Sequence, residues 1–101
     1  MQRLKAELKV AGGKLVRVCV QTEGGRVESL KLTGDFFLHP EDSISKIEEC
    51  VRGAALEDDG AEIAGRIDSL ARRDGLLLVG FSGSDVAKAI IAATATGKKI
   101  E

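Results

Sequence analysis

The chain of 101 residues has the size of one small domain, and its composition narrows the class of protein it can be. Hydrophobic residues make up 44% of it, which is enough for one modest core and too little for two domains. Its 15 basic and 16 acidic side chains nearly cancel, leaving a formal net charge of −1. A protein that holds nucleic acid by its phosphates needs a basic surplus, so nucleic acid is not expected as the main partner.

No apolar run approaches the roughly 20 residues that span a bilayer, so no membrane association is expected. The first residues, Met1 to Lys5, lack the apolar block of a secretory signal, and we therefore expect a cytoplasmic protein. Cys19 and Cys50 stand far apart with no second cysteine near either, which gives no zinc or redox motif. Free cysteines are often buried, and we expect both to be small core residues.

The first third of the chain has the pattern of three β-strands. Residues 4–10 alternate apolar and charged side chains, as in a strand with one buried face. Gly12-Gly13 predicts a tight hairpin, after which residues 14–22 bring three valines to one face. A second glycine pair precedes residues 27–33, which return with their leucines on the inner side. The segment is predicted to be an antiparallel meander that is apolar on one side.

Helical spacing follows the meander. Pro40 suits a first helical position, because its missing N–H costs nothing there, and Gly53 suits a helix stop. A second helix is predicted from Asp59, an N-cap with Glu62 three residues on, as in a capping box. A third helix is predicted from Ser82, again with a carboxylate three residues on.

The segment Leu76 to Gly80 is ambiguous, because its four apolar residues fit either a short strand or an extended packed connector. The connector is favoured here. A sheet with one apolar face, followed by amphipathic helices, makes a two-layer α+β domain. We predict a single domain over residues 1–101, a three-stranded antiparallel meander packed against about three helices.

Few residues suggest catalysis. There is no phosphate loop and no glycine-rich dinucleotide turn. The single histidine, His39, precedes Pro40 with no nucleophile beside it, which is typical of a surface or capping residue. Asp35 stands before Phe36 and Phe37, and its simplest interpretation is a turn aspartate beside two phenylalanines that close the core. Successive strand residues point to opposite faces, so only one of the two rings can enter the core if the segment is extended.

Lys14 and Asp35 are predicted to lie at the same end of the sheet. Lys14 follows a glycine pair, where its ammonium could help exposed N–H groups hold a phosphate or carboxylate, although most such lysines are only solvated. Counting outward from a turn at Gly24-Gly25 sets Lys14 opposite Asp35, where the pair could be functional or an ordinary surface salt bridge. The apolar pattern prefers another register, with Val16 and Val18 opposite Leu32 and Leu30. A bulge near either end of the hairpin, with Gly34 as one plausible place, would reconcile the two.

Two segments carry a family resemblance. The first reads Gly-Gly-Lys-Leu-Val-Arg-Val over residues 12–18, and the second reads Thr-Gly-Asp-Phe-Phe-Leu-His-Pro-Glu over residues 33–41. Together they resemble the C-terminal accessory domain of lipoate–protein ligases, most closely the form encoded as a separate small protein in archaea. The resemblance covers residues 4–55 well and the last helix loosely. The residues that continue the second segment are Ile44, Ile47, Glu48 and Gly53.

The resemblance implies an accessory subunit that binds no cofactor alone and holds no complete active site. Its partner would be a large catalytic subunit that uses ATP, Mg and lipoate to make lipoyl-AMP, then modifies a lysine of a lipoyl-domain protein. The implied fold is the two-layer α+β type shared with sulfur-transfer and iron–sulfur scaffold proteins. The candidates for facing substrate or adenylate are Gly13, Lys14 and Asp35, and the candidates for the partner interface are Phe36, Phe37 and His39.

Adenylation gives a physical reason for such a subunit, because it brings a carboxylate against a phosphate in a water-poor site. A small domain docked on the large subunit could order loops, exclude water and lend one cation. We expect that cation to be Lys14, oriented by Asp35. Transfer needs room for a protein substrate, so the domain would then have to move aside.

The sequence is also compatible with two other functions. An iron–sulfur scaffold or sulfur acceptor would share the implied fold, but a cluster is usually held by several thiolates and this chain has two cysteines. The second alternative is a stand-alone binding module without a ligase partner.

Overall fold

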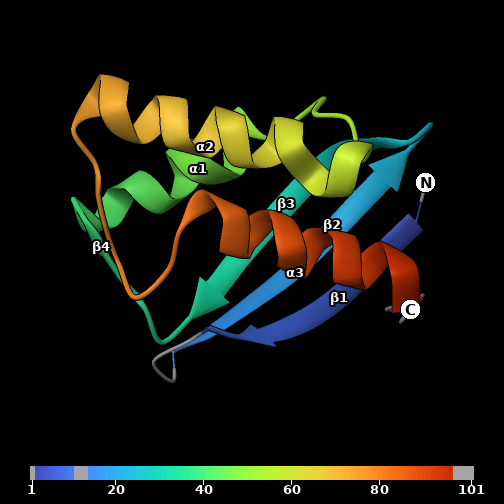
Figure 1. The fold of residues 1–101 in the computed structure, drawn as a ribbon, viewed down its shortest axis with the longest axis horizontal. Coiled ribbons are helices and arrows are strands. Elements are labelled where there is room, and N and C mark those ends of the chain that lie inside the picture. The colour runs from blue at the N-terminus through green and yellow to red at the C-terminus, as the bar shows by residue number, and fades with distance from the viewer. Residues whose placement is uncertain (1, 11–13, 97–101) are drawn as a thin grey trace.

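The computed structural model describes residues 2–10 and 14–96 and places helices on one side of a three-stranded sheet (Figure 1). The elements in chain order are β1 (Gln2–Lys9), β2 (Leu15–Glu23), β3 (Arg26–Gly34), β4 (Phe37–His39), the 3₁₀ turn η1 (Glu41–Ser43), α1 (Ile44–Cys50), the 3₁₀ turn η2 (Asp58–Gly60), α2 (Ala61–Asp74), β5 (Leu77–Val79) and α3 (Gly83–Thr96).

The predicted meander is confirmed. Strand β2 lies between β1 and β3 and pairs antiparallel with both. The three valines of its inner face, Val16, Val18 and Val20, are fully buried, as the alternating pattern requires. The tight turn predicted at Gly12-Gly13 lies outside the described residues.

The β2–β3 hairpin contains a bulge, and it lies near the turn rather than at the far end of the sheet. Thr22 pairs with Val27, but the neighbouring Gln21 pairs with Ser29, so Glu28 is an extra residue on β3. Beyond the bulge Val18 faces Leu32 and Val20 faces Leu30, whereas Val16 faces Gly34. The expected pairing of Val16 and Val18 with these leucines is therefore wrong by one pair of residues. The bulge nevertheless reconciles the turn with the apolar pattern, because it shifts the register by one residue before the core begins.

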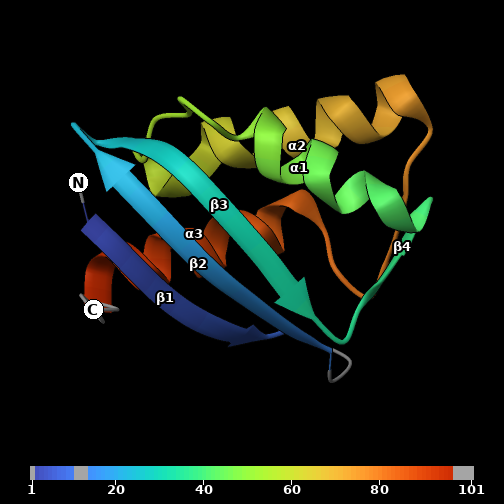
Figure 2. The ribbon, with the colours of Figure 1, turned by 180° about the vertical axis from the view of Figure 1, so that it is seen from behind.

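The helices form the second layer. Helix α3 packs on β1 and β2, α2 packs against α3, and α1 packs beside β3. Figure 1 shows α3 in front of the sheet, and Figure 2, seen from behind, shows the strands in front of α3. Isoleucines from all three helices, Ile47, Ile63, Ile67 and Ile90, are fully buried in the core. The two-layer α+β class is thus confirmed. None of the helices in the described ranges has the length and apolar character needed to cross a membrane.

The helix starts differ from the sequence predictions in two of three cases. Pro40 is extended, with ψ 149°, and precedes η1 instead of standing inside a helix. Asp59 is not the N-cap of α2, because it lies inside η2 with φ 54° and Gly60 takes the capping position. The capping box at α3 is confirmed: the Ser82 N–H donates to the Asp85 carboxylate at 2.9 Å, and the Asp85 N–H donates to the Ser82 hydroxyl at 3.3 Å.

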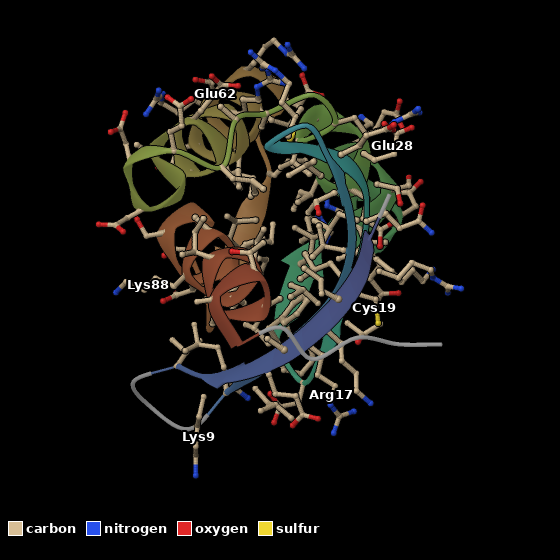
Figure 3. All side chains as sticks on the ribbon, turned by 90° about the vertical axis from the view of Figure 1, so that its right-hand side faces the viewer. Lys9, Arg17, Cys19, Glu28, Glu62 and Lys88 are labelled. Carbon is tan, nitrogen blue, oxygen red and sulfur yellow. The ribbon has the colours of Figure 1, made fainter. Side chains whose placement is uncertain are left out.

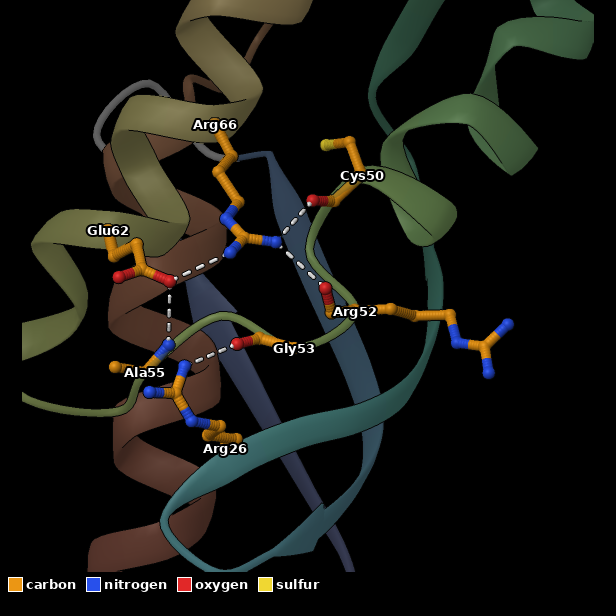
Figure 4. A network of polar contacts seen from close by, with 7 residues as sticks. All are labelled: Arg26, Cys50, Arg52, Gly53, Ala55, Glu62 and Arg66. Atoms are coloured by element: carbon orange, nitrogen blue, oxygen red, sulfur yellow. Dashed lines mark hydrogen bonds and ion pairs between the residues drawn. The ribbon is translucent and has the colours of Figure 1, made fainter.

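The loop between α1 and α2 is fastened on both sides by charged side chains (Figure 4). Arg66 of α2 donates to the backbone carbonyls of Cys50 and Arg52, at 3.3 and 2.8 Å. From the other side, Arg26 of β3 donates to the Gly53 carbonyl at 2.8 Å. The bond to Cys50 satisfies a carbonyl at the end of α1, which has no partner within the helix, and the other two bonds hold the loop that follows.

Glu62 also holds this loop in place, instead of forming the predicted capping box. Its carboxylate accepts the Ala55 N–H at 3.0 Å and pairs with Arg66 at 2.9 Å. The Ala55 hydrogen bond is the main cause that lowers the pKa of Glu62, and the Arg66 charge lowers it further. The carboxylate therefore ties the loop to α2 in its charged form.

Neither cysteine is a fully buried core residue, contrary to the prediction, although Cys50 packs against the core. Cys19 is exposed on the outer face of β2, because it alternates with the buried valines. Cys50 is half-buried at the end of α1, and this burial raises the pKa of its thiol, against the lowering effect of Arg66 and Arg73. Among the residues described, no group of three or more His, Cys, Asp or Glu side chains could hold a metal ion.

Candidate functional site

Asp35 closes the end of the sheet rather than orienting Lys14. Its N–H donates to the Leu15 carbonyl at 3.1 Å, and its carboxylate accepts the Leu15 N–H. Because of the bulge, the register brings Leu15 and not Lys14 to Asp35, so the predicted pair is wrong. Gly34 is required beside this contact, since a Cβ there would lie 2.1 Å from the Leu15 carbonyl oxygen.

Lys14 reaches instead across the end of the sheet to the segment after β5. A Cβ on Gly80 would lie 2.6 Å from the Lys14 Cγ, so the aliphatic part of the lysine packs directly on the glycine backbone. Gly80 has φ +88°, a conformation that favours glycine. The Lys14 ammonium lies over the ring of Phe37, 5.3 Å from its centroid, within the range of a cation–π contact. Lys14 is thus held at a defined place rather than freely solvated.

Phe36 and Phe37 point in different directions, as the alternation of strand residues requires. Phe36 is half-buried and stacks on Phe81, with ring centroids 4.2 Å apart at 37°. Phe81 is 6% exposed, so this pair joins the start of β4 to the core. Phe37, by contrast, is 66% exposed.

Strands β4 and β5 form a separate two-stranded ribbon with one exposed face. Figure 1 shows β4 at the edge of the molecule. Phe37 pairs with Val79 and His39 with Leu77, and all four are exposed, whereas Leu38 between them is buried. Phe37, Leu77 and Val79 are the large apolar residues that the structure leaves exposed within its described ranges. We name Phe37, His39, Leu77 and Val79 the ribbon face. Contiguous exposed apolar side chains of this kind are typical of contact sites for another protein.

Strand β5 corrects the prediction for Leu76 to Gly80, which favoured a connector. Residues 77–79 pair with β4, and Leu77 and Val79 supply half of the ribbon face. The sequence does indicate this strand, because a short apolar run bounded by glycines, here Gly75 and Gly80, is typical of a short strand. The pairing partner was not evident, because β4 is only three residues long.

The structure gathers most of the predicted site residues at one end of the molecule. Phe37 and His39 lie on the ribbon face, Lys14 touches Phe37, and Phe36 lies beneath them. A shallow groove beside the ribbon is lined by Phe36, Phe37, Leu38, Glu41 and Ile44. Asp35 belongs to the frame that supports this end, and Gly13 lies outside the described residues.

The fold and the ribbon face define a small α+β domain that presents an apolar contact surface with a cation at its edge. No family model matches the chain. In sequence it is similar to lipoate-protein ligase A subunit 2 of Thermoplasma acidophilum, with 42% identity over 43 residues. That alignment spans 43% of this chain and 46% of the subunit, less than half the length of each.

The fold comparison extends over nearly the whole chain. A solved structure of an archaeal lipoylation system, described as a bi-partite lipoate protein ligase and its E2 lipoyl domain from Thermoplasma acidophilum, contains a similar chain. The TM-score is 0.72 and the identity 28%, over 89% of this chain and 97% of that one. These two findings confirm the resemblance to the accessory-subunit family of lipoate–protein ligases.

Proposed function

We propose that this chain is an accessory subunit of a lipoate–protein ligase, acting with a large catalytic subunit. In this role it is required for the ATP-dependent activation of lipoate to lipoyl-AMP, before the lipoyl group passes to a lysine of a lipoyl-domain protein. ATP, Mg and lipoate are bound by the complex and not by this chain alone. The observation that carries the proposal is the ribbon face with Lys14 at its edge, on a fold similar to a chain of a bi-partite ligase system.

The ribbon face is the proposed contact for the large subunit. An exposed phenylalanine flanked by two exposed aliphatic residues can supply the apolar centre that a stable protein interface needs. His39 and the groove residue Glu41 are both exposed and provide a polar edge. Phe36 anchors the ribbon to the core through Phe81, so the surface is presented on a fixed support.

Lys14 is the proposed contribution of this chain to adenylation. Its ammonium lies over Phe37, so docking of the ribbon face would carry it into the interface and remove water around it. A cation in a water-poor site stabilises developing negative charge far better than one in solvent. Lys14 therefore faces either the adenylate phosphate or a loop that surrounds it. Gly80 and Phe37 now take the positioning role first assigned to Asp35.

The proposal is tested by separating the two half-reactions of the cognate ligase. Lipoyl-AMP formation from ATP and lipoate should need both proteins, and this chain alone should form none. Transfer from preformed lipoyl-AMP to the acceptor lysine should proceed with the large subunit alone at saturating acceptor. Pyrophosphate release by this chain alone, or collapse of transfer in its absence, would contradict the proposed division of labour.

A further inference from the structure

The outer face of the meander is open to solvent and carries a concentrated positive charge. The helices cover only the inner face, and Figure 3 shows Arg17 and Cys19 on the open side of the sheet, with Lys88 on the helical side. Alternation places the exposed side chains of the strands on this outer face. We name its basic residues the basic sheet face: Arg3, Lys5, Lys9, Arg17 and Lys31.

The register concentrates this charge around the exposed thiol of Cys19. Lys5 pairs with Cys19 from β1 and Lys31 pairs with it from β3, so two lysines flank it in one row. Arg3, Cys19 and Lys31 also line a shallow hollow in the same face. The one acidic side chain in the body of the face is Glu7, which pairs with Arg17 at 3.4 Å. Four basic residues there have no ion pair with any residue that the structure describes.

The rest of the chain has the opposite balance. Five of the 15 basic residues lie on this face, whereas the whole chain has a net charge of −1. Glu23 and Glu28 stand at the hairpin tip together with Arg26, so the excess of positive charge ends before the tip. The positive area is also narrow, since three paired strands are only about 10 Å wide. Such a surface fits a compact acidic patch better than a long polyanion, which would run onto the acidic surroundings.

We infer that the basic sheet face docks the acceptor protein through an acidic patch on the lipoyl domain. This inference rests on the proposed function, which supplies two protein partners. The large subunit must stay bound through adenylation, and the apolar ribbon face suits that stable contact. A fully charged, well-hydrated face instead favours rapid, reversible, salt-sensitive encounter, as a protein substrate requires. The large subunit alone still transfers the lipoyl group at saturating acceptor, and this chain lowers the acceptor concentration needed.

The test compares two double variants with equal change of charge in the reconstituted ligase. Lys5→Gln/Lys31→Gln removes the pair beside Cys19, and Arg72→Gln/Lys88→Gln removes two exposed cations from the helical side. Transfer from preformed lipoyl-AMP is measured against acceptor concentration. We expect the first variant to raise the acceptor KM about three- to tenfold at low salt without changing kcat. The second variant should leave KM unchanged, and the difference should vanish at high salt.

A footprint at Cys19 gives an independent readout. Alkylation of Cys19 by N-ethylmaleimide, followed by mass spectrometry in a Cys50→Ser background, should slow when the acceptor is added and not when the large subunit is added. Equal KM values for the two double variants, or protection of Cys19 by the large subunit instead, would overturn the inference. So would salt-sensitive binding of a short DNA duplex as tight as that of the acceptor. Lipoyl-AMP synthesis, which uses no acceptor, is the reference: its absence with the wild-type chain would instead reject the proposed function.

Discussion

At the scale of single residues, two glycines decide where Lys14 can reach. Gly34 allows the Leu15 carbonyl to approach the turn after β3, and Gly80 gives the lysine chain a flat backbone to lie on. A side chain at either position would collide with these neighbours, at 2.1 and 2.6 Å. Gly34 and Asp35 are therefore explained by their contacts with Leu15, which fix the end of the sheet. The function proposed for Lys14 depends on these contacts, because Lys14 precedes Leu15.

Removing the Lys14 charge should lower the adenylation rate of the reconstituted ligase. Lys14→Met keeps the aliphatic packing on Gly80 and removes only the ammonium. We expect a loss of at least about tenfold in lipoyl-AMP formation, since one lost donor to a developing oxyanion can cost on the order of a hundredfold. The melting temperature and the affinity for the large subunit should stay unchanged. A rate within about twofold of wild type would be far smaller than the loss expected for an oxyanion donor. It would identify Lys14 as a solvated loop lysine.

Glu62 should make the fold sensitive to acid. Its pKa is lowered in the folded chain, first by the Ala55 N–H and then by Arg66. A carboxyl with a lower pKa when folded adds stability above its unfolded pKa, and loses it as pH falls through the folded value. Urea unfolding of Glu62→Gln should therefore show lower stability at neutral pH and a shallower decline on acidification. Glu57→Gln, on the same loop, is the control. Parallel pH curves for Glu62→Gln and wild type would contradict this account.

At the scale of elements, the ribbon pairs β4, which directly precedes η1 and α1, with β5, which directly precedes α3. Phe36 beneath it and Phe37 above it come from one strand end but have different tasks. Sequence alternation alone predicts that they diverge, without saying which one enters the core. The structure assigns the buried position to Phe36 through its contact with Phe81.

Truncation of the two phenylalanines should separate stability from association. Phe36→Ala should lower the free energy of unfolding by about 2–3 kcal/mol, below the ~3–5 of a fully buried phenylalanine, because the ring is half-exposed. Phe37→Ala should leave stability nearly unchanged and weaken binding to the large subunit by about tenfold or more. Titration calorimetry measures the binding and thermal unfolding the stability, with exposed Arg72→Ala as the control. Equal unfolding of both variants without selective loss of affinity would place the interface elsewhere.

The meander and the capping box of α3 could be predicted from the sequence, because both arise from local patterns. Alternation fixes the inner face of β2, and Ser82 with Asp85 satisfies the first N–H groups of α3. The start of α2 could not be predicted from local pattern. Glu62, expected to complete a capping box with Asp59, instead accepts the Ala55 N–H, a contact that exists only once the loop has folded. A bulge was expected at one of the two ends of the β2–β3 hairpin, since the turn and the core specify different registers. The sequence did not indicate that it lies at Glu28, near the turn.

At the scale of the whole molecule, the two candidate contact surfaces differ in chemistry and in position. The ribbon face is apolar and stands at the end of the sheet, whereas the basic sheet face lies on the side that the helices leave open (Figures 1 and 3). A chain of this size can thus contact one partner stably and another transiently. The basic sheet face was not evident from composition, because the net charge of −1 averages its positive charge with the negative charge of the rest of the chain.

The central claim is that this chain enables the large subunit to make lipoyl-AMP, and one titration tests it most directly. The rate of lipoyl-AMP formation by a fixed amount of the cognate large subunit is measured, with ATP, Mg and lipoate saturating, as this chain is added. We predict negligible synthesis without the chain and a rise that saturates at equal amounts of the two proteins, with Phe37→Ala requiring more protein to reach the same plateau. Full synthesis by the large subunit alone, unaffected by the added chain, would contradict the claim.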